Sequence, residues 1–205
     1  MLRSTAVRQV ILLGPSLVLA VLMIFHPSPY DDVAGELLPI AGWWTFLHTA
    51  QFFLFTCVGA SVWILVDGLR GVAAVVARVA AVIFVLFYDI GDAVAGIATG
   101  ILAGKVASGA IPEDAAVTAI RAVFTDLTKD VFFGVGIFAW LLALGASAVA
   151  LWRAGAARVP VFLLALPALL LTFDHAFPFG ALTFASFFLV VLWLEISQRR
   201  SRSSP

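Results

Sequence analysis

Six long apolar stretches, separated by short polar segments, dominate the pattern of the chain. Each approaches the roughly 20 apolar residues that a helix needs to cross a hydrocarbon core about 30 Å thick, where no water can satisfy the backbone. The pattern therefore predicts an all-α polytopic membrane protein with six transmembrane helices in one bundle. The predicted spans are residues 9–25, 42–66, 76–103, 131–152, 159–174 and 180–196. They form one domain, residues 1–198, followed by a basic tail, residues 199–205.

Composition agrees with a lipid environment. Hydrophobic residues make up 63% of the chain, charged residues 12%, and the mean hydropathy is +1.11, values far from those of a soluble domain. The formal net charge is zero, and no basic patch with interleaved aromatic residues occurs, so the sequence predicts no nucleic-acid partner. Cys57 is the only cysteine, which excludes a disulfide framework and a cysteine metal cluster.

The basic residues fall mainly on one side of the six predicted spans. Because Lys and Arg concentrate in cytoplasmic loops, this bias predicts cytoplasmic N- and C-termini. The nine on the predicted cytoplasmic side are Arg3, Arg8, Arg70, Arg78, Arg153, Arg158, Arg199, Arg200 and Arg202, and the three on the outer side are Lys105, Arg121 and Lys129. The preference for Arg, Ala, Val, Leu and Gly favours a bacterial inner membrane, that is, a plasma membrane. The basic tail is expected to be disordered and to attract anionic lipid.

One connecting segment, residues 105–130, is long enough to hold structure of its own. Pro112, Glu113 and Asp114 are typical of a helix start, and apolar residues then recur at helical spacing. These apolar residues are Ile120, Val123, Phe124 and Leu127. The segment is predicted to form an amphipathic helix at the outer surface, which serves either as a connector or as a lid over a site.

The third predicted span carries a small-residue stripe and two carboxylates. Gly96, Gly100 and Gly104 are spaced so that a neighbouring helix, in this chain or in a second copy, can approach closely. A homo-oligomer could therefore form. Asp89 and Asp92 are three residues apart and share a face, at a depth where an ionised carboxylate costs about 2.5–3.5 kcal/mol. They therefore need a partner, a proton, a metal ion or a water-filled pocket.

Candidate partners lie on the neighbouring predicted spans. His48 lies at a similar depth on the second span, and His175 lies in a Pro- and Gly-rich break between the last two, the kind of interruption that builds sites in membrane proteins. We expect Asp89, Asp92, His48 and His175 to form the site. Supporting residues are expected to be Gln51, Tyr88, Asp174 and His26, of which His26 is the outlier. His26 and His175 each follow a predicted span and precede a proline, so they could occupy related places.

Three hypotheses for this site remain open. It could be an outward-facing pocket that binds or carries a cation, proton or small ligand, since imidazole titrates near physiological pH. Alternatively, the polar residues only fix helix packing. In a third hypothesis they hold a divalent metal such as Zn²⁺ in an intramembrane hydrolase or transferase; haem is a weaker candidate. No phosphate-binding loop, serine-hydrolase elbow or Cys-x-x-Cys motif occurs, and the sequence does not identify a catalytic residue.

Overall fold

The computed structural model describes residues 5–28 and 32–203, and all regular structure within them is helical. Five helical segments there are long and apolar enough to cross a membrane. They are α1 (Thr5–Ile24), α3 (Ala41–Leu65) with its short N-terminal extension, α4 (Val72–Asp92) continued by η2 (Ala93–Ala98) and α5 (Thr99–Ala107), α7 (Leu127–Arg153), and α10 (Phe179–Ser203). The predicted all-α fold is confirmed, and five long apolar helices are consistent with a membrane protein. Arg3 and the last two residues of the tail lie outside the described residues. The prediction of a disordered tail is wrong for residues 199–203, which continue α10 as helix.

The remaining helices are short. They are α2 (Val33–Leu37) and η1 (Leu38–Ile40), which lead into α3, α6 (Glu113–Thr125), and the pair α8 (Arg158–Leu163) and α9 (Ala165–Leu170). The pair replaces the fifth predicted span with two helices of six residues each. Together they reach only about 20 Å, because a helix rises about 1.5 Å per residue. Pro160 lies in the first turn of α8, where a backbone N–H would have no partner within the helix. Pro167 lacks the N–H that would continue the hydrogen bonding of α8 into α9.

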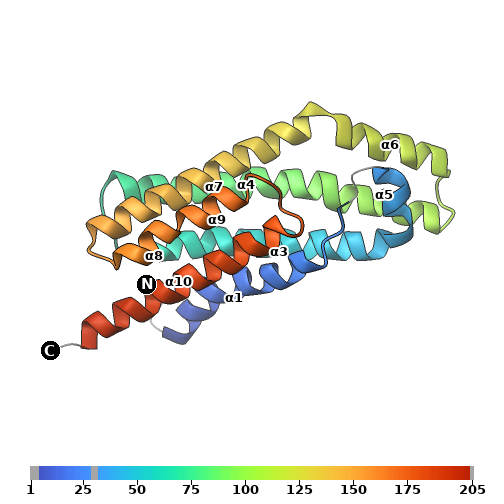
Figure 1. Cartoon of the computed structure of the whole chain (residues 1–205). Helices are drawn as coiled ribbons and strands as arrows, with labels where there is room; N and C mark the ends of the chain where they lie inside the picture. The colour runs from blue at the N-terminus through green and yellow to red at the C-terminus, as the bar shows by residue number, and fades with distance from the viewer. Residues whose placement is uncertain (1–4, 29–31, 204–205) are drawn as a thin grey trace.

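The long helices lie side by side, and the chain folds back and forth along the bundle (Figure 1). Both termini lie at one end, here named the terminal end, and α6 lies at the opposite end, here named the α6 end (Figure 1). α4 packs along α7, and α1 packs against both α3 and α10. At the terminal end, Arg8 of α1 forms an ion pair with Glu195 of α10, which joins the first and last helices.

Aromatic side chains fill the middle of the bundle. Six of them, here named the aromatic core, are at most 1% exposed: Phe55, Phe84, Tyr88, Trp140, Phe184 and Phe187. The ring of Trp140 packs 5.0 Å from Phe84 and 5.4 Å from Phe187, between centroids. Its indole N–H donates to the carbonyl of Pro167 at 2.9 Å. Trp140 therefore joins α7 to the short helix α9 through both packing and a hydrogen bond.

At the α6 end, the amphipathic helix begins at Glu113 as the sequence predicts and covers α2 and α5. Ala116 and Ile120 face inward and are buried. Arg121 donates to Asp32 at 3.2 Å, an exposed ion pair that links α6 to the residue before α2. The apolar face ends before Leu127, which is 77% exposed and begins α7.

Candidate metal centre

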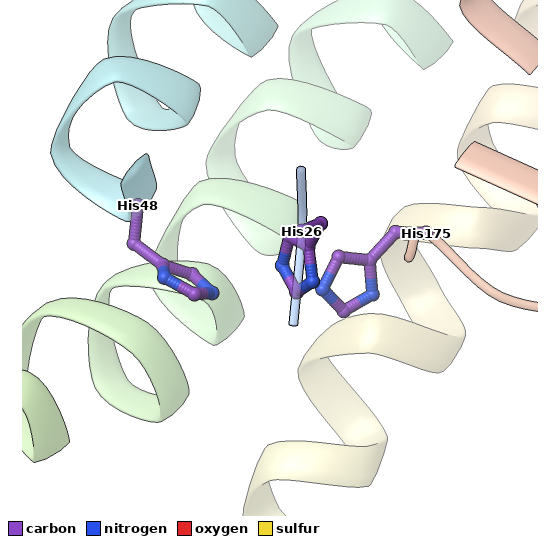
Figure 2. Close-up of side chains that lie close together, drawn as sticks. All are labelled: His26, His48 and His175. Atoms are coloured by element: carbon purple, nitrogen blue, oxygen red, sulfur yellow. The ribbon is translucent and has the colours of Figure 1, made fainter. Parts of the chain in front are cut away.

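Three histidines from three separate segments meet near the α6 end. His26 is the second residue after the end of α1 at Ile24, and Pro27 follows it directly and disfavours helical backbone there. His48 lies in the second turn of α3, and His175 lies in the loop between α9 and α10. Because α9 ends at Leu170, that loop turns back into the bundle and brings His175 beside the end of α1 (Figure 2). Non-helical backbone is tolerated at such a place when protein surrounds it.

The three rings lie side by side, with His26 between His48 and His175 (Figure 2). The ring centroid of His26 lies 5.1 Å from that of His48 and 4.9 Å from that of His175. One nitrogen from each ring can be chosen so that all three lie within 4.8 Å of one another. A tetrahedral ion with bonds of about 2.0–2.1 Å needs nitrogens about 3.3 Å apart, so ring shifts of about 1.5 Å or less would complete the geometry.

Backbone carbonyls fix the orientation of two of these rings. Nδ1 of His26 lies 2.6 Å from the carbonyl oxygen of Pro27, and Nδ1 of His48 lies 2.9 Å from that of Trp44. Since a carbonyl can only accept, each Nδ1 carries the proton and each Nε2 keeps its lone pair. Nε2 of His26 is buried and has no hydrogen-bond partner. Histidine ligands are typically held in this way, with the second ring nitrogen donating to a carbonyl or carboxylate.

His175 has a carboxylate in the equivalent place. Its Nδ1 lies 3.6 Å from Oδ1 of Asp174, and the ring of Phe133 stacks on it with centroids 5.8 Å apart. Burial lowers the pKa of His175; Asp174 opposes this shift, whereas the positive charge of Lys129 adds to it. Burial also lowers the pKa of His26, with further lowering from the two neighbouring histidines. Both rings are therefore neutral at pH 7, the form that binds a metal.

Asp92 is a second carboxylate beside the cluster. Its Oδ1 lies 3.9 Å from Nε2 of His48, its side chain is 1% exposed, and among the described residues neither of its oxygens has a hydrogen-bond partner. It directly precedes the π-helical turn η2, and such turns frequently mark functional sites because the extra residue redirects side chains. A buried and unpartnered carboxylate beside three imidazoles is a chemically suitable addition to a cation site.

Gly96 makes room for His48. A Cβ atom on Gly96 would lie 2.0 Å from Cδ2 and 2.1 Å from Cγ of the His48 ring. Gly100 similarly lies against Thr45 and Trp44, whereas a Cβ on Gly104 would meet no atom within 4 Å. The first glycine of the stripe therefore has a specific role here, since it allows α3 to place an imidazole against η2.

The structure separates the other predicted site residues from the cluster. Asp89 accepts a hydrogen bond from Oγ1 of Thr56 at 2.8 Å, one turn from Asp92 toward the terminal end, and is not in the cavity wall. Gln51 donates to Sδ of Met23 at 3.4 Å. Tyr88 belongs to the aromatic core and touches the site only through the edge of its ring, 6.3 Å from that of His175. His26, expected to be an outlier, lies between the other two histidines.

A cavity of about 450 Å³ opens beside the histidines. Its wall combines the three histidines, Asp92 and Asp174 with Lys129 and several apolar side chains. The apolar side chains used below are Val33, Trp44, Phe124 and Phe133. Three imidazoles with room for a further ligand resemble catalytic zinc sites, where three protein ligands leave one position open.

Comparisons of the chain with protein-family models, with curated proteins and with solved structures found no match. The functional argument therefore rests on the residues and distances of this site.

Proposed function

We propose that this is an integral membrane protein that binds one divalent transition-metal ion through His26, His48 and His175 and uses it to activate water in a hydrolytic reaction. The observation that carries the proposal is the convergence of three neutral imidazoles, with ligand atoms within 4.8 Å, on a cavity of about 450 Å³. A metal ion lowers the pKa of bound water to about 7 and so supplies a nucleophile at neutral pH.

The donor set favours zinc. Imidazole nitrogens suit Zn²⁺, Cu²⁺, Fe²⁺ and Ni²⁺, whereas Ca²⁺ and Mg²⁺ prefer oxygen ligands. Haem fits less well, because its two axial histidines must stand on opposite faces of the porphyrin, whereas these three rings converge on one point.

The middle of the bundle argues for a retained ion over a transported one. The aromatic core lies directly on the terminal side of the cluster, where the Tyr88 ring packs 4.9 Å from Phe55 and 5.2 Å from Phe84. These side chains are at most 1% exposed and their rings pack against one another, which disfavours passage of an ion toward the terminal end. We therefore place hydrolysis ahead of the carrier role that the sequence also allows, and ahead of a role in helix packing alone.

For the membrane topology we propose six crossings, with α8 and α9 as a short fifth crossing, cytoplasmic termini, and a cavity that opens outward at the plasma membrane. Support comes from the nine-to-three distribution of basic residues and from the position of both termini at the same end of the bundle (Figure 1). Cysteine accessibility of Arg121→Cys and Arg153→Cys, each in a Cys57→Ser background, tests this. Labelling of the first but not the second in intact cells is expected, and the reverse pattern would invert the topology.

Metal analysis of detergent-purified protein tests the site, with the affinity tag removed because a histidine tag binds metal. Wild-type protein is expected to retain about one zinc ion per chain after chelator-free desalting. His26→Ala, His48→Ala and His175→Ala should each lose it, and Asp89→Asn, a buried polar control away from the cavity, should keep it. Visible absorbance of the same samples detects haem.

Two results would overturn the metal site: wild-type protein that stays metal-free after incubation with Zn²⁺, or a folded His48→Ala variant that keeps its ion. If all variants are metal-free, folded and merely less stable, the histidines serve helix packing.

A further inference from the structure

The lining of the cavity beside the histidines is of two chemical kinds. It combines the imidazoles and Asp92 with the apolar side chains of Val33, Phe124 and Phe133. A site for a small hydrophilic ion alone would not need the apolar lining, and a site for a purely apolar ligand would not tolerate the buried carboxylate. A ligand that satisfies both has a polar head and an apolar chain.

Among the described residues that line the cavity, Lys129 is the one lysine or arginine. Lys129 lies one turn before Phe133 on the same face of α7, and the Phe133 ring stacks on His175. This spacing places Lys129 about one helical turn, roughly 5 Å along α7, from Phe133 toward the α6 end.

The ammonium is held at that position by two contacts. Its Nζ lies 5.4 Å from the centroid of the Phe124 ring and 3.1 Å from Oδ1 of Asp130. The Lys129 side chain is only 18% exposed, whereas that of Asp130 is 60% exposed. Lys129 is therefore directed along the cavity wall, and its carboxylate partner remains largely in solvent, where such a pair is worth little and can exchange.

A bound metal ion would reverse the charge of the cavity. With neutral histidines, the ionisable side chains in its wall are Asp92, Asp174 and Lys129, which carry minus one in total when both carboxyl groups are ionised. A divalent ion changes this total to plus one, and bound ions are typically the largest local charges in their sites. The loaded cavity therefore attracts an anion more strongly than the metal-free cavity does.

Apolar side chains also surround the segments that form the mouth. Leu127 and Val131 on α7 are 77% and 58% exposed, and Phe173 and Phe177 on the His175 loop are 69% and 54% exposed. In a membrane these side chains face lipid, so an alkyl chain that leaves the cavity would meet an apolar environment.

We propose that the metal-loaded cavity binds an amphiphile whose oxyanion head, a phosphate or a carboxylate, bridges the open position of the metal and the Lys129 ammonium while its alkyl chain lies along Val33, Phe124 and Phe133. This proposal rests on the metal site proposed above. It names the class of ligand that the site would recognise or hydrolyse.

Thermal unfolding in maltoside detergent tests the proposal, because a ligand that binds only the folded protein raises the unfolding midpoint. The probes are dodecyl phosphate, inorganic phosphate and dodecanol, each added to zinc-loaded and to metal-free protein. Dodecyl phosphate is expected to raise the midpoint of the loaded protein only, and inorganic phosphate and dodecanol to do so weakly or not at all. Lys129→Gln should weaken dodecyl phosphate binding about tenfold, as expected for loss of one charged hydrogen bond. Lys105→Gln, an exposed lysine outside the cavity wall, should leave binding unchanged.

The outcomes separate this proposal from the metal site. Protein that binds no zinc defeats the metal site and this proposal with it. Zinc-loaded protein that shows no shift with dodecyl phosphate, or the same shift as metal-free protein or as Lys129→Gln, overturns the ligand proposal alone. An equal response to inorganic phosphate would show a free anion as the ligand, and an equal response to dodecanol would show that the head group is not recognised; either result overturns the amphiphile.

Discussion

The aromatic core and the histidine cavity lie next to each other in one bundle and treat polar groups differently. In the core, the one indole N–H is paired with the carbonyl of Pro167. In the cavity, Nε2 of His26 and both carboxylate oxygens of Asp92 are buried without a hydrogen-bond partner among the described residues. Other unpartnered buried atoms occur singly elsewhere: on Gln51, Asp89, Ser147 and Thr183.

The difference has an energetic meaning. Each buried polar group without a partner costs about 1–3 kcal/mol, and more when it is charged. The unpartnered groups around the cavity therefore lower the free energy of unfolding, and a bound cation would remove this penalty. We infer that the aromatic core stabilises the fold, whereas the cavity is less stable without its ligand. Substitutions in the two regions should accordingly change different measured quantities.

The largest effect on stability is expected from Trp140→Ala. Loss of this side chain removes contacts to Phe84 and Phe187, leaves the Pro167 carbonyl unpaired, and should cost about 3–5 kcal/mol. The midpoint of thermal unfolding should fall strongly, while the fraction that remains folded keeps its metal. Trp152→Ala, which removes a half-exposed ring, is the control and should have a small effect. Folded but metal-free Trp140→Ala protein would contradict the division between core and cavity.

Gly96→Ala should produce the largest effect on metal binding that requires no change to a ligand. The added Cβ would lie within 2.6 Å of three His48 atoms, so the imidazole or η2 must move. We expect zinc affinity to fall about 100-fold, at the upper limit for residues that orient metal ligands. Competition with a fluorescent chelator measures this change. Gly104→Ala, which meets no atom within 4 Å, should keep wild-type affinity. Equal affinities for the two variants would show that Gly96 does not position His48.

Substitutions of the two α4 carboxylates, Asp89 and Asp92, should have different effects on zinc affinity in the same assay. Asp92→Asn removes a negative charge 3.9 Å from Nε2 of His48, and a reduction in zinc affinity of about tenfold is expected. Asp89→Asn keeps a group that can bond to Thr56 and lies away from the cavity, so it should bind zinc like wild type. A loss of affinity in Asp89→Asn equal to that in Asp92→Asn would mean that both carboxylates act on the ion.

The sequence predicted the positions of most helices, but it predicted the contacts between helices less well. The length of the apolar runs predicted the five long helices, because a helix that crosses a membrane must match the thickness of the hydrocarbon core. The helix start at Glu113 followed from local residue preferences. The segment with Pro160 and Pro167 also reads as an apolar span, but its hydrogen bonding is interrupted, and only the structure shows the two short helices. Trp140 lies mid-span, and the sequence does not reveal its bond to Pro167.

The arrangement of the site depends on which neighbouring helix each side chain faces, and a single sequence does not give this information. His48, His175 and Asp92 could be selected by depth, yet depth along one helix does not say which neighbour a side chain faces. Asp89 and Asp92 therefore appeared equivalent until the structure showed one at Thr56 and the other at His48. His26 carried one usable signal, because both it and His175 follow a predicted span and precede a proline. The early end of α9, which brings His175 next to His26, could not be read from composition.

The smallest predicted effect concerns the metal-free protein in mild acid. Burial lowers the pKa of His26 below its ordinary value of 6.5, so the folded protein keeps this ring neutral while the unfolded chain takes up a proton. Because the unfolded state then binds more protons, stability should fall as the pH drops from 6.5 toward the lowered pKa. By pH 5.5 the loss of stability from this residue is about 1 kcal/mol.

His26→Gln cannot titrate, so its unfolding midpoint should change less between pH 7 and pH 5.5 than that of metal-free wild type. Zinc should suppress the dependence in wild type until acid displaces the ion, because the bound rings cannot take up protons. An equal change of the midpoint in metal-free wild type and in His26→Gln over this interval would show that His26 is open to water, and the cavity would then lose its distinction from the surface.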